Sequence, residues 1–248
     1  MDNISISGAR IYFEIPLFGG IPITETQVNS LIVIAVIFAL CLFLTHDLKV
    51  RPTSKRQLIA EWIVEKVTGL VRENMGSRFL PFAPFIAAIL GLSALSSLTA
   101  LLGMYPPTAD LNTVLGWALL VFVLITYFKI RTSGPLGYLK GFTEPIFVFT
   151  PFNILGEIAT PISMAFRHFG NVVSGTVIST LVYAALAGLS TLVFGWLPGL
   201  LGKIPFLQVG VPAILSIYFD LFSSCMQAFI FAMLTMLYIA NAAAAADD

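Results

Sequence analysis

The sequence predicts an all-α integral membrane protein with about five membrane-spanning helices and one amphipathic helix in the interface. Of the 248 residues, 58% are hydrophobic and only 10% are charged, and the mean hydropathy is +0.93. A soluble domain carries about 25% charged residues, so most of this surface must face lipid. The 13 basic and 13 acidic residues balance and form no long basic run, so we expect no nucleic acid partner.

The N-terminal part predicts a leader, a span and an interfacial helix within a single membrane domain over residues 1–248, which no internal repeat divides. Residues 1–28 mix polar and apolar side chains and are expected to form a non-spanning leader. Residues 29–45 can just cross the hydrocarbon layer. In residues 57–75, apolar side chains recur at helical spacing and charges lie mostly elsewhere, which predicts a helix in the interface plane. The apolar stripe of that helix contains Leu58, Trp62, Ile63, Val67, Leu70 and Val71.

The middle of the chain predicts two further spans. Apolar runs cover residues 79–103 and 112–129, with a short turn at Pro106 and Pro107 between them. The following residues, 131–141, are polar and are expected to form a connector.

The C-terminal part contains the longest apolar region, residues 145–197, which is too long for one simple crossing. Pro151 and Pro161 interrupt it and are expected to permit a bent segment. Such backbone is tolerated in a membrane only where it lines a cavity or is buried in protein. A final apolar helix is expected over residues 209–244.

The distribution of basic residues predicts the orientation, because loops on the inner side of a membrane are rich in Lys and Arg. With the N-terminus outside and five crossings, the outer side receives only Arg10 and Lys203, and Arg167 stays in the membrane. The C-terminus is then inside. The inner side receives Lys49, Arg51, Lys55, Arg56, Lys66, Arg72, Arg78, Lys129, Arg131 and Lys140.

Ionisable side chains at bilayer depth cost at least ~2.5 kcal/mol and usually mark functional sites. The candidates are Glu157, Arg167 and His168 in the long apolar region and Asp220 in the final helix, with Glu144 near the membrane boundary as a weaker one. No P-loop or HExxH motif suggests an enzyme site of a soluble type.

Arg167 is the central candidate. Asn171 and Gly175 follow it at intervals of four residues, so the three share one helix face. An Arg side chain stays protonated and can act only as a fixed positive charge, while Gly175 leaves a gap on the same face. The alternative is a structural ion pair between Arg167 and Glu157 or Asp220.

The other polar residues have weaker but specific patterns. Asp220 and Gln227 are seven residues apart and are expected to share a face of the final helix. Asp220 can change its protonation state, and the Gln227 amide can hydrogen-bond across helices. His168 points about 100° around the helix from Arg167 and is interpreted as a packing or tuning residue. Thr176 either lines a polar passage or bonds to its own helix backbone.

Asn153 and Glu157 lie four residues apart between the two prolines of the long region. This spacing places both side chains on one helix face. We expect them to form part of the wall of a water-filled entrance.

Two segments resemble the signature of the F-type ATP synthase subunit a family. The family pattern around its essential Arg, Pro-[Val/Ile]-Ser-x-x-x-Arg-x-Phe-Gly-Asn-x-x-[Ala/Ser]-Gly, is matched throughout by residues 161–175. Residues 20–30 are similar to the leader of bacterial members. The final-helix pattern, an acidic residue or His, then x6-Gln-Ala-Phe-Ile-Phe, then Thr and Tyr, is matched by Asp220, residues 227–231, Thr235 and Tyr238.

The resemblance implies a stator subunit of the membrane sector of a rotary ATP synthase, with no catalytic site or cofactor of its own. Arg167 would face a ring of c subunits between two offset half-channels, and Asn171 and Gln227 would help to position it. Residues 145–244 would form a tilted hairpin against that ring. Subunit b of the peripheral stalk and, through the complex, the catalytic head would be further partners. The expected location is a bacterial inner membrane, with the proton as the default ion.

The same resemblance assigns the half-channels and shows two departures. Asp220 would be the titratable group of the outer half-channel, and Glu157 a lining group of the inner one. The family often has Leu where this chain has His168, and many members have Glu or His where it has Thr176. The outer half-channel would therefore depend on Asp220 alone.

Two other interpretations stay open from the residues. A secondary transporter would have inverted repeats or paired broken helices, whereas this sequence has one broken polar region. An intramembrane enzyme could use Glu157, His168 and Asp220 as an acid/base set, but it would also need a nucleophile or metal ligands at compatible spacing.

Overall fold

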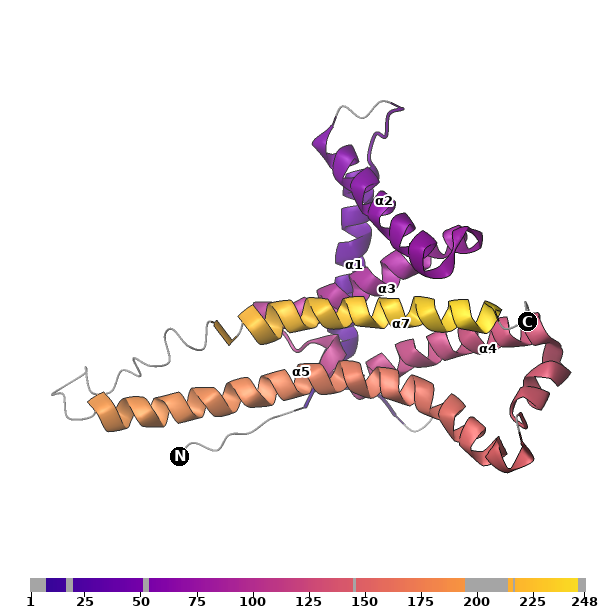
Figure 1. Ribbon diagram of the computed structural model, residues 1–248. Helices are drawn as coiled ribbons and strands as arrows, with labels where there is room; N and C mark the ends of the chain where they lie inside the picture. The colour runs from indigo at the N-terminus through magenta and orange to yellow at the C-terminus, as the bar shows by residue number, and fades with distance from the viewer. Residues whose placement is uncertain are drawn as a thin grey trace.

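The computed structural model is helical almost throughout and confirms the predicted fold class (Figure 1). It describes residues 8–16, 20–50, 54–144, 146–194, 214–215 and 217–244. Within these ranges, five segments are long and apolar enough to cross a membrane: Glu25–Thr45, Ser77–Leu102, Leu111–Gly141, Phe147–Val193 and Ile217–Ala244.

The described part of the leader forms a small antiparallel hairpin rather than a span. Strand β1 (Ile11–Ile15) pairs with β2 (Ile21–Thr24), and helix α1 (Glu25–Thr45) follows at once. The helix begins before residue 29 because Thr24 provides its N-cap, where the Thr24 amide donates to the Gln27 side chain at 3.2 Å.

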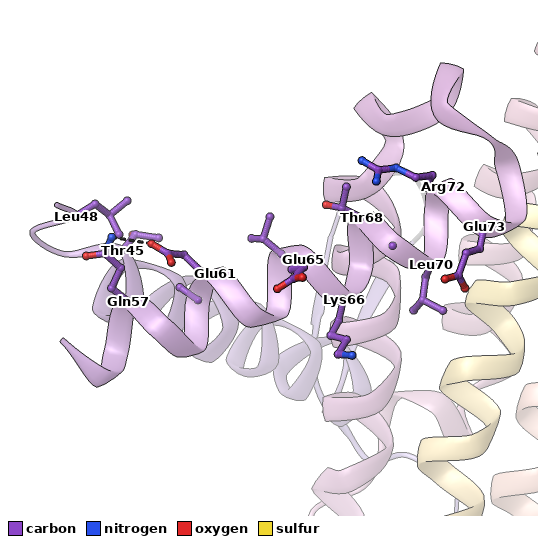
Figure 2. Close-up of a pocket in the computed structure, with 13 residues that line it drawn as sticks. Thr45, Leu48, Gln57, Glu61, Glu65, Lys66, Thr68, Leu70, Arg72 and Glu73 are labelled. Atoms are coloured by element: carbon purple, nitrogen blue, oxygen red, sulfur yellow. Dashed lines mark hydrogen bonds between the residues drawn. The ribbon is translucent and has the colours of Figure 1, made fainter. Parts of the chain in front are cut away.

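Helix α2 (Lys55–Met75) follows α1 and is amphipathic, as the apolar stripe predicts. The stripe divides in two: Leu58 and Trp62 are exposed, whereas Val67 and Val71 are buried in the core. At its start, Gln57 closes the corner with α1 by donating to the Lys49 carbonyl at 2.6 Å and to the Glu61 carboxylate at 2.7 Å. Figure 2 shows Gln57 and Glu61 near one end of a groove lined largely by α2.

The next two spans are interrupted helices. A 3₁₀ turn, η1 (Ser77–Phe82), leads into α3 (Ala83–Leu98), which ends in η2 (Thr99–Leu102). Turn η3 (Pro107–Ala109) connects it to α4 (Leu111–Gly141), which starts at the Asp110 N-cap. Asn29 of α1 donates to the Tyr105 carbonyl at 2.8 Å and so ties this connection to α1.

The polar connector predicted at residues 131–141 is itself helical, and α4 includes it up to Gly141, across a break at Gly134. The chain kinks at Gly134, whose φ of +73° suits glycine, just before Pro135, which lacks a backbone donor. Helix resumes after the kink, because polar residues outside the hydrocarbon layer can be helical as readily as apolar ones.

The long apolar region forms turn η4 (Phe147–Phe149) and one helix, α5 (Thr150–Phe194), of 45 residues. At 1.5 Å per residue it is about 67 Å long, roughly twice the hydrocarbon thickness, so it can cross a bilayer only when strongly tilted. Pro151 does not break it, since the second helical position needs no backbone donor. Pro161 lies inside the helix, which changes direction in its N-terminal part (Figure 1). The predicted end, residues 195–197, lies outside the described residues.

The last segment begins as a π-helix, η7 (Ile217–Ser223), and continues as α7 (Ser224–Ala244). Residues 209–213 of the predicted helix lie outside the described ranges. Helix α7 contacts α3, α4 and α5, and runs beside α5 and crosswise to α1 (Figure 1). The core where these helices meet contains Ile86, Val114, Val121, Phe231, Met236 and Ile239.

Candidate functional site

The two adjacent residues Arg167 and His168 lie on different sides of α5. His168 is 0% exposed, and its Nε2 lies 3.3 Å from the Ser93 hydroxyl. Its ring also packs edge-on against Trp117 and Phe231. The side chain of His168 therefore packs between α3, α4 and α7, whereas Arg167 is exposed on the side of α5 away from this core.

The structural ion pair considered for Arg167 does not occur in the part of the chain that the structure describes. Glu157 instead accepts from Lys129, with Nζ 2.6 Å from Oε2. Among the described residues, Arg167 is thus a positive charge without an ion-pair partner, with Phe166 and Ile162 exposed nearby. A charge in this position needs a partner outside the chain or a hydrated environment.

Asn171 and Gly175, on the face that Arg167 begins, are covered by η7. The Asn171 amide donates to the Ser223 carbonyl at 3.3 Å, and the Ser223 hydroxyl donates to the Asn171 Oδ1 at 2.9 Å. A Cβ added at Gly175 would lie 3.4 Å from the Phe219 side chain. The gap that the sequence predicts at Gly175 is therefore filled by Phe219.

The π-helix separates Asp220 from Gln227. Seven residues span two turns of an α-helix, but a π-helix has more residues per turn, so the predicted shared face is not kept across Ser223. Asp220 lies half-buried beside a cavity, while Gln227 is 5% exposed within the core side of α7. No hydrogen bond of the Gln227 side chain occurs among the described residues.

One cavity, here called the leader cavity, lies between the C-terminal half of α5 and the start of α1. It has a volume of about 550 Å³ and is open to the surface. Thr176 lines it while donating to its own helix at the Val172 carbonyl (3.0 Å), so both alternatives for Thr176 hold together. Its other polar side chains are Arg10, Glu25, Tyr105, Ser179, Thr180, Tyr183 and Asp220.

Tyr105 is a neutral hydrogen-bonding group in this cavity. Burial raises the pKa of its hydroxyl above the ordinary value of 10, and the carboxylates of Asp110 and Glu25 raise it further. Because its folded-state pKa lies above 10, Tyr105 stays protonated at any physiological pH.

A second cavity, here called the α4 cavity, lies between α4, the N-terminal half of α5 and the end of α7. Its volume is about 580 Å³. Asn153 and Glu157 both line it, and Asn153 donates to the carbonyls of Phe142 (2.8 Å) and Glu144 (3.0 Å). The Glu144 side chain is exposed and lies 3.8 Å from Lys140, outside the cavity lining. The other polar side chains of this lining are Lys129, Ser133, Tyr138, Thr160, Tyr238 and Asn241.

Arg167 lies along α5 between the two cavities. The α4 cavity reaches Thr160, and the leader cavity begins at Thr176. At 1.5 Å per residue these limits are about 10 Å and 13 Å from Arg167 along the helix axis. The arrangement is two cavities on one helix, each lined in part by polar side chains and separated by a segment that carries a fixed cation.

Several residues of this site were not predicted. Lys129 was expected only as an inner-side charge, and Ser223, Phe219 and Glu25 were not singled out at all. They meet the predicted residues across helices, which the periodicity of a single helix does not reveal. In the described ranges, no group of three or more His, Cys, Asp or Glu side chains is suited to hold a metal ion.

Replacing Ser223 with Ala is expected to lower the stability of the α5–η7 contact by about 1 kcal/mol, because Asn171 loses the hydroxyl donor to its Oδ1. The measurement is the midpoint of thermal unfolding in detergent. Ser174→Ala is the matched control, because the Ser174 hydroxyl is exposed and bonds only within its own helix. An equal effect of both substitutions would contradict the contribution of the Ser223 bond.

The chain is similar to known proteins over most of its length. The model of the ATP synthase A chain family matches residues 28–240. The chain is 31% identical over 227 residues to ATP synthase subunit a of Staphylococcus saprophyticus, covering 87% of this chain and 89% of the relative. It is 34% identical to ATP synthase subunit a of Acidothermus cellulolyticus, covering 89% and 77%. It is 41% identical to the sodium ion specific ATP synthase subunit a of Propionigenium modestum, covering 54% and 39%.

Proposed function

The chain belongs to the ATP synthase A chain family, and from this premise we propose how it carries ions across the membrane sector of an F-type ATP synthase. In the proposal, the leader cavity is the outer half-channel and the α4 cavity is the inner one. Arg167 separates them and faces the carboxyl groups of a ring of c subunits. The observation that carries the proposal is the order of cavity, cation and cavity along α5.

The charge of Arg167 explains how rotation and ion flow would be coupled. An ion that enters through the leader cavity neutralises a ring carboxylate, which can then face lipid. When that carboxyl group reaches Arg167 after a full turn, the guanidinium favours the ionised form and so favours release of the ion into the α4 cavity. The same cation repels any ion moving directly between the cavities. Flow without rotation is therefore blocked.

The side chains around Arg167 would hold this geometry. Asn171 is held by Ser223, and Gly175 permits the close approach of Phe219, so α5 and η7 are locked together beside the cation. Asp220 is the titratable carboxylate of the outer half-channel that lies on the same pair of helices as Arg167. His168 supports the position of α5 through core packing and does not carry the ion.

The proposal also includes the orientation of the chain in the membrane and its neighbouring subunits. The N-terminus lies outside and the C-terminus in the cytoplasm, in a bacterial inner membrane, since this places the basic corner of α1 and α2 inside. The exposed apolar surface of α5 and α7 then faces the c-ring and lipid. ATP chemistry takes place on the catalytic head, to which subunit b connects this stator chain.

The test of the function is ATP-driven ion uptake by inverted membrane vesicles that contain the whole complex. With the chain present we expect acidification of the vesicle lumen, which is monitored by the quenching of a pH-sensitive dye. With the gene for this chain deleted we expect no acidification. Acidification without added sodium would support the proton as the coupling ion. Sodium uptake that persists with a protonophore would instead indicate sodium. ATP hydrolysis with no ion uptake by an intact complex would contradict the proposal.

A further inference from the structure

The α4 cavity contains an ion pair that the family signature does not include. Lys129 of α4 and Glu157 of α5 approach to 2.6 Å, with side chains 34% and 16% exposed. The Tyr138 hydroxyl donates to the other carboxylate oxygen of Glu157 at 3.4 Å. Glu157 is thus held on both oxygens by α4, from either side of the kink at Gly134.

The neighbouring charges do not compete for this pair. Arg131 donates to the Tyr127 hydroxyl at 3.4 Å, and Lys140 lies 3.8 Å from Glu144 outside the cavity lining. The polar side chains that α7 contributes to the cavity are the phenol of Tyr238 and the amide of Asn241. Within the described residues, Lys129 and Glu157 are therefore the charged side chains of the α4 cavity.

We propose that Lys129 is a positioning residue of the inner half-channel, which holds Glu157 as a paired carboxylate so that Glu157 lines the path without trapping the translocated cation. The inference rests on the proposed function of the α4 cavity. Glu157 then serves as a fixed part of the wall, and its negative charge is balanced where the ion passes.

The physical reason is that replacing one member of an ion pair leaves an unpaired charge, whereas replacing both members leaves none. Without Lys129, the unpaired carboxylate of Glu157 would bind the passing cation and slow its movement. Without Glu157, the ammonium group of Lys129 would repel the same cation. Removing both leaves a neutral cavity with neither fault, so the double variant should conduct better than either single variant.

A double-mutant cycle of Lys129→Met and Glu157→Gln tests the pair in the assembled complex. The measurement is the initial rate of ATP-driven ion uptake by inverted vesicles, normalised to the amount of intact complex. We expect each single variant to lose about threefold or more in rate, and the double variant to be less impaired than either, as for residues in direct contact. The reversed pair, Lys129→Glu with Glu157→Lys, is expected to recover part of the rate lost by Lys129→Glu alone.

The matched control is the exposed pair Lys140 and Glu144. It also joins a Lys to a Glu, but it lies outside the cavity lining. Lys140→Met and Glu144→Gln are expected to leave the rate unchanged, since such surface pairs contribute little. Losses at Lys129 and Glu157 that multiply in the double variant would overturn the proposed pairing. Failure of the proposed function itself would appear differently, as ion uptake that is absent from the wild-type complex.

Discussion

Replacing Arg167 with Ala is expected to abolish ATP-driven ion uptake while the complex still assembles. The side chain is exposed and makes no hydrogen bond or ion pair within the described residues, so its removal deletes no contact that holds the fold. Its loss removes the charge that releases the ion from each ring carboxylate. Without this cation between the leader cavity and the α4 cavity, ions can also leak passively from one cavity to the other.

The measurement compares the variants in inverted vesicles at equal amounts of complex. Arg167→Lys keeps the charge but loses the planar, delocalised guanidinium, and we expect it to pump poorly without the leak of Arg167→Ala. Arg131→Ala is the control, because Arg131 is also exposed and its one described bond is to Tyr127. Normal uptake by Arg167→Ala would overturn the central role of this residue.

The membrane spans could be predicted from the sequence because hydropathy over about 20 residues is a strong signal. The same signal does not show whether the polar connector after the third span is helical. Residues 131–141 are polar and include Gly134 and Pro135, where the helix is interrupted before it resumes and runs to Gly141. Hydropathy reports which residues lie in lipid, whereas helix continuity depends on backbone hydrogen bonds that extend beyond the lipid.

Candidate residues such as Arg167 and Glu157 could be named from the sequence, but their contacts could not. Gly175 appeared to leave a gap, and the structure places Phe219 against it. The seven-residue spacing of Asp220 and Gln227 suggested one face, and the π-helix Ile217–Ser223 removes that register. The ion pair of Lys129 and Glu157 joins α4 to α5. Such contacts depend on how helices pack, and no period within one helix encodes them.

Replacing Asp220 with Asn is expected to reduce ion uptake and ATP synthesis by about 100-fold, the lower end of the range for a positioned proton-transfer group. Asn has nearly the same shape as Asp and keeps a hydrogen-bonding side chain, so the packing of η7 should survive. It cannot change its charge, however. The leader cavity then loses the carboxylate of η7, the segment that packs against α5 beside Arg167.

The comparison with Glu25 decides which carboxylate of the leader cavity passes the ion. Glu25 lines the same cavity but belongs to the first turn of α1, where its backbone amide donates to the Arg10 carbonyl at 2.8 Å. We expect Glu25→Gln to have a smaller effect than Asp220→Asn, Asp220→Glu to keep partial activity, and Glu14→Gln on the exposed hairpin to have none. If Glu25→Gln were the more severe variant, the ion would enter along α1, and Asp220 would have a structural role. A large loss with Asp220→Asn and partial recovery with Asp220→Glu would mean that the outer half-channel requires a titratable group at this position.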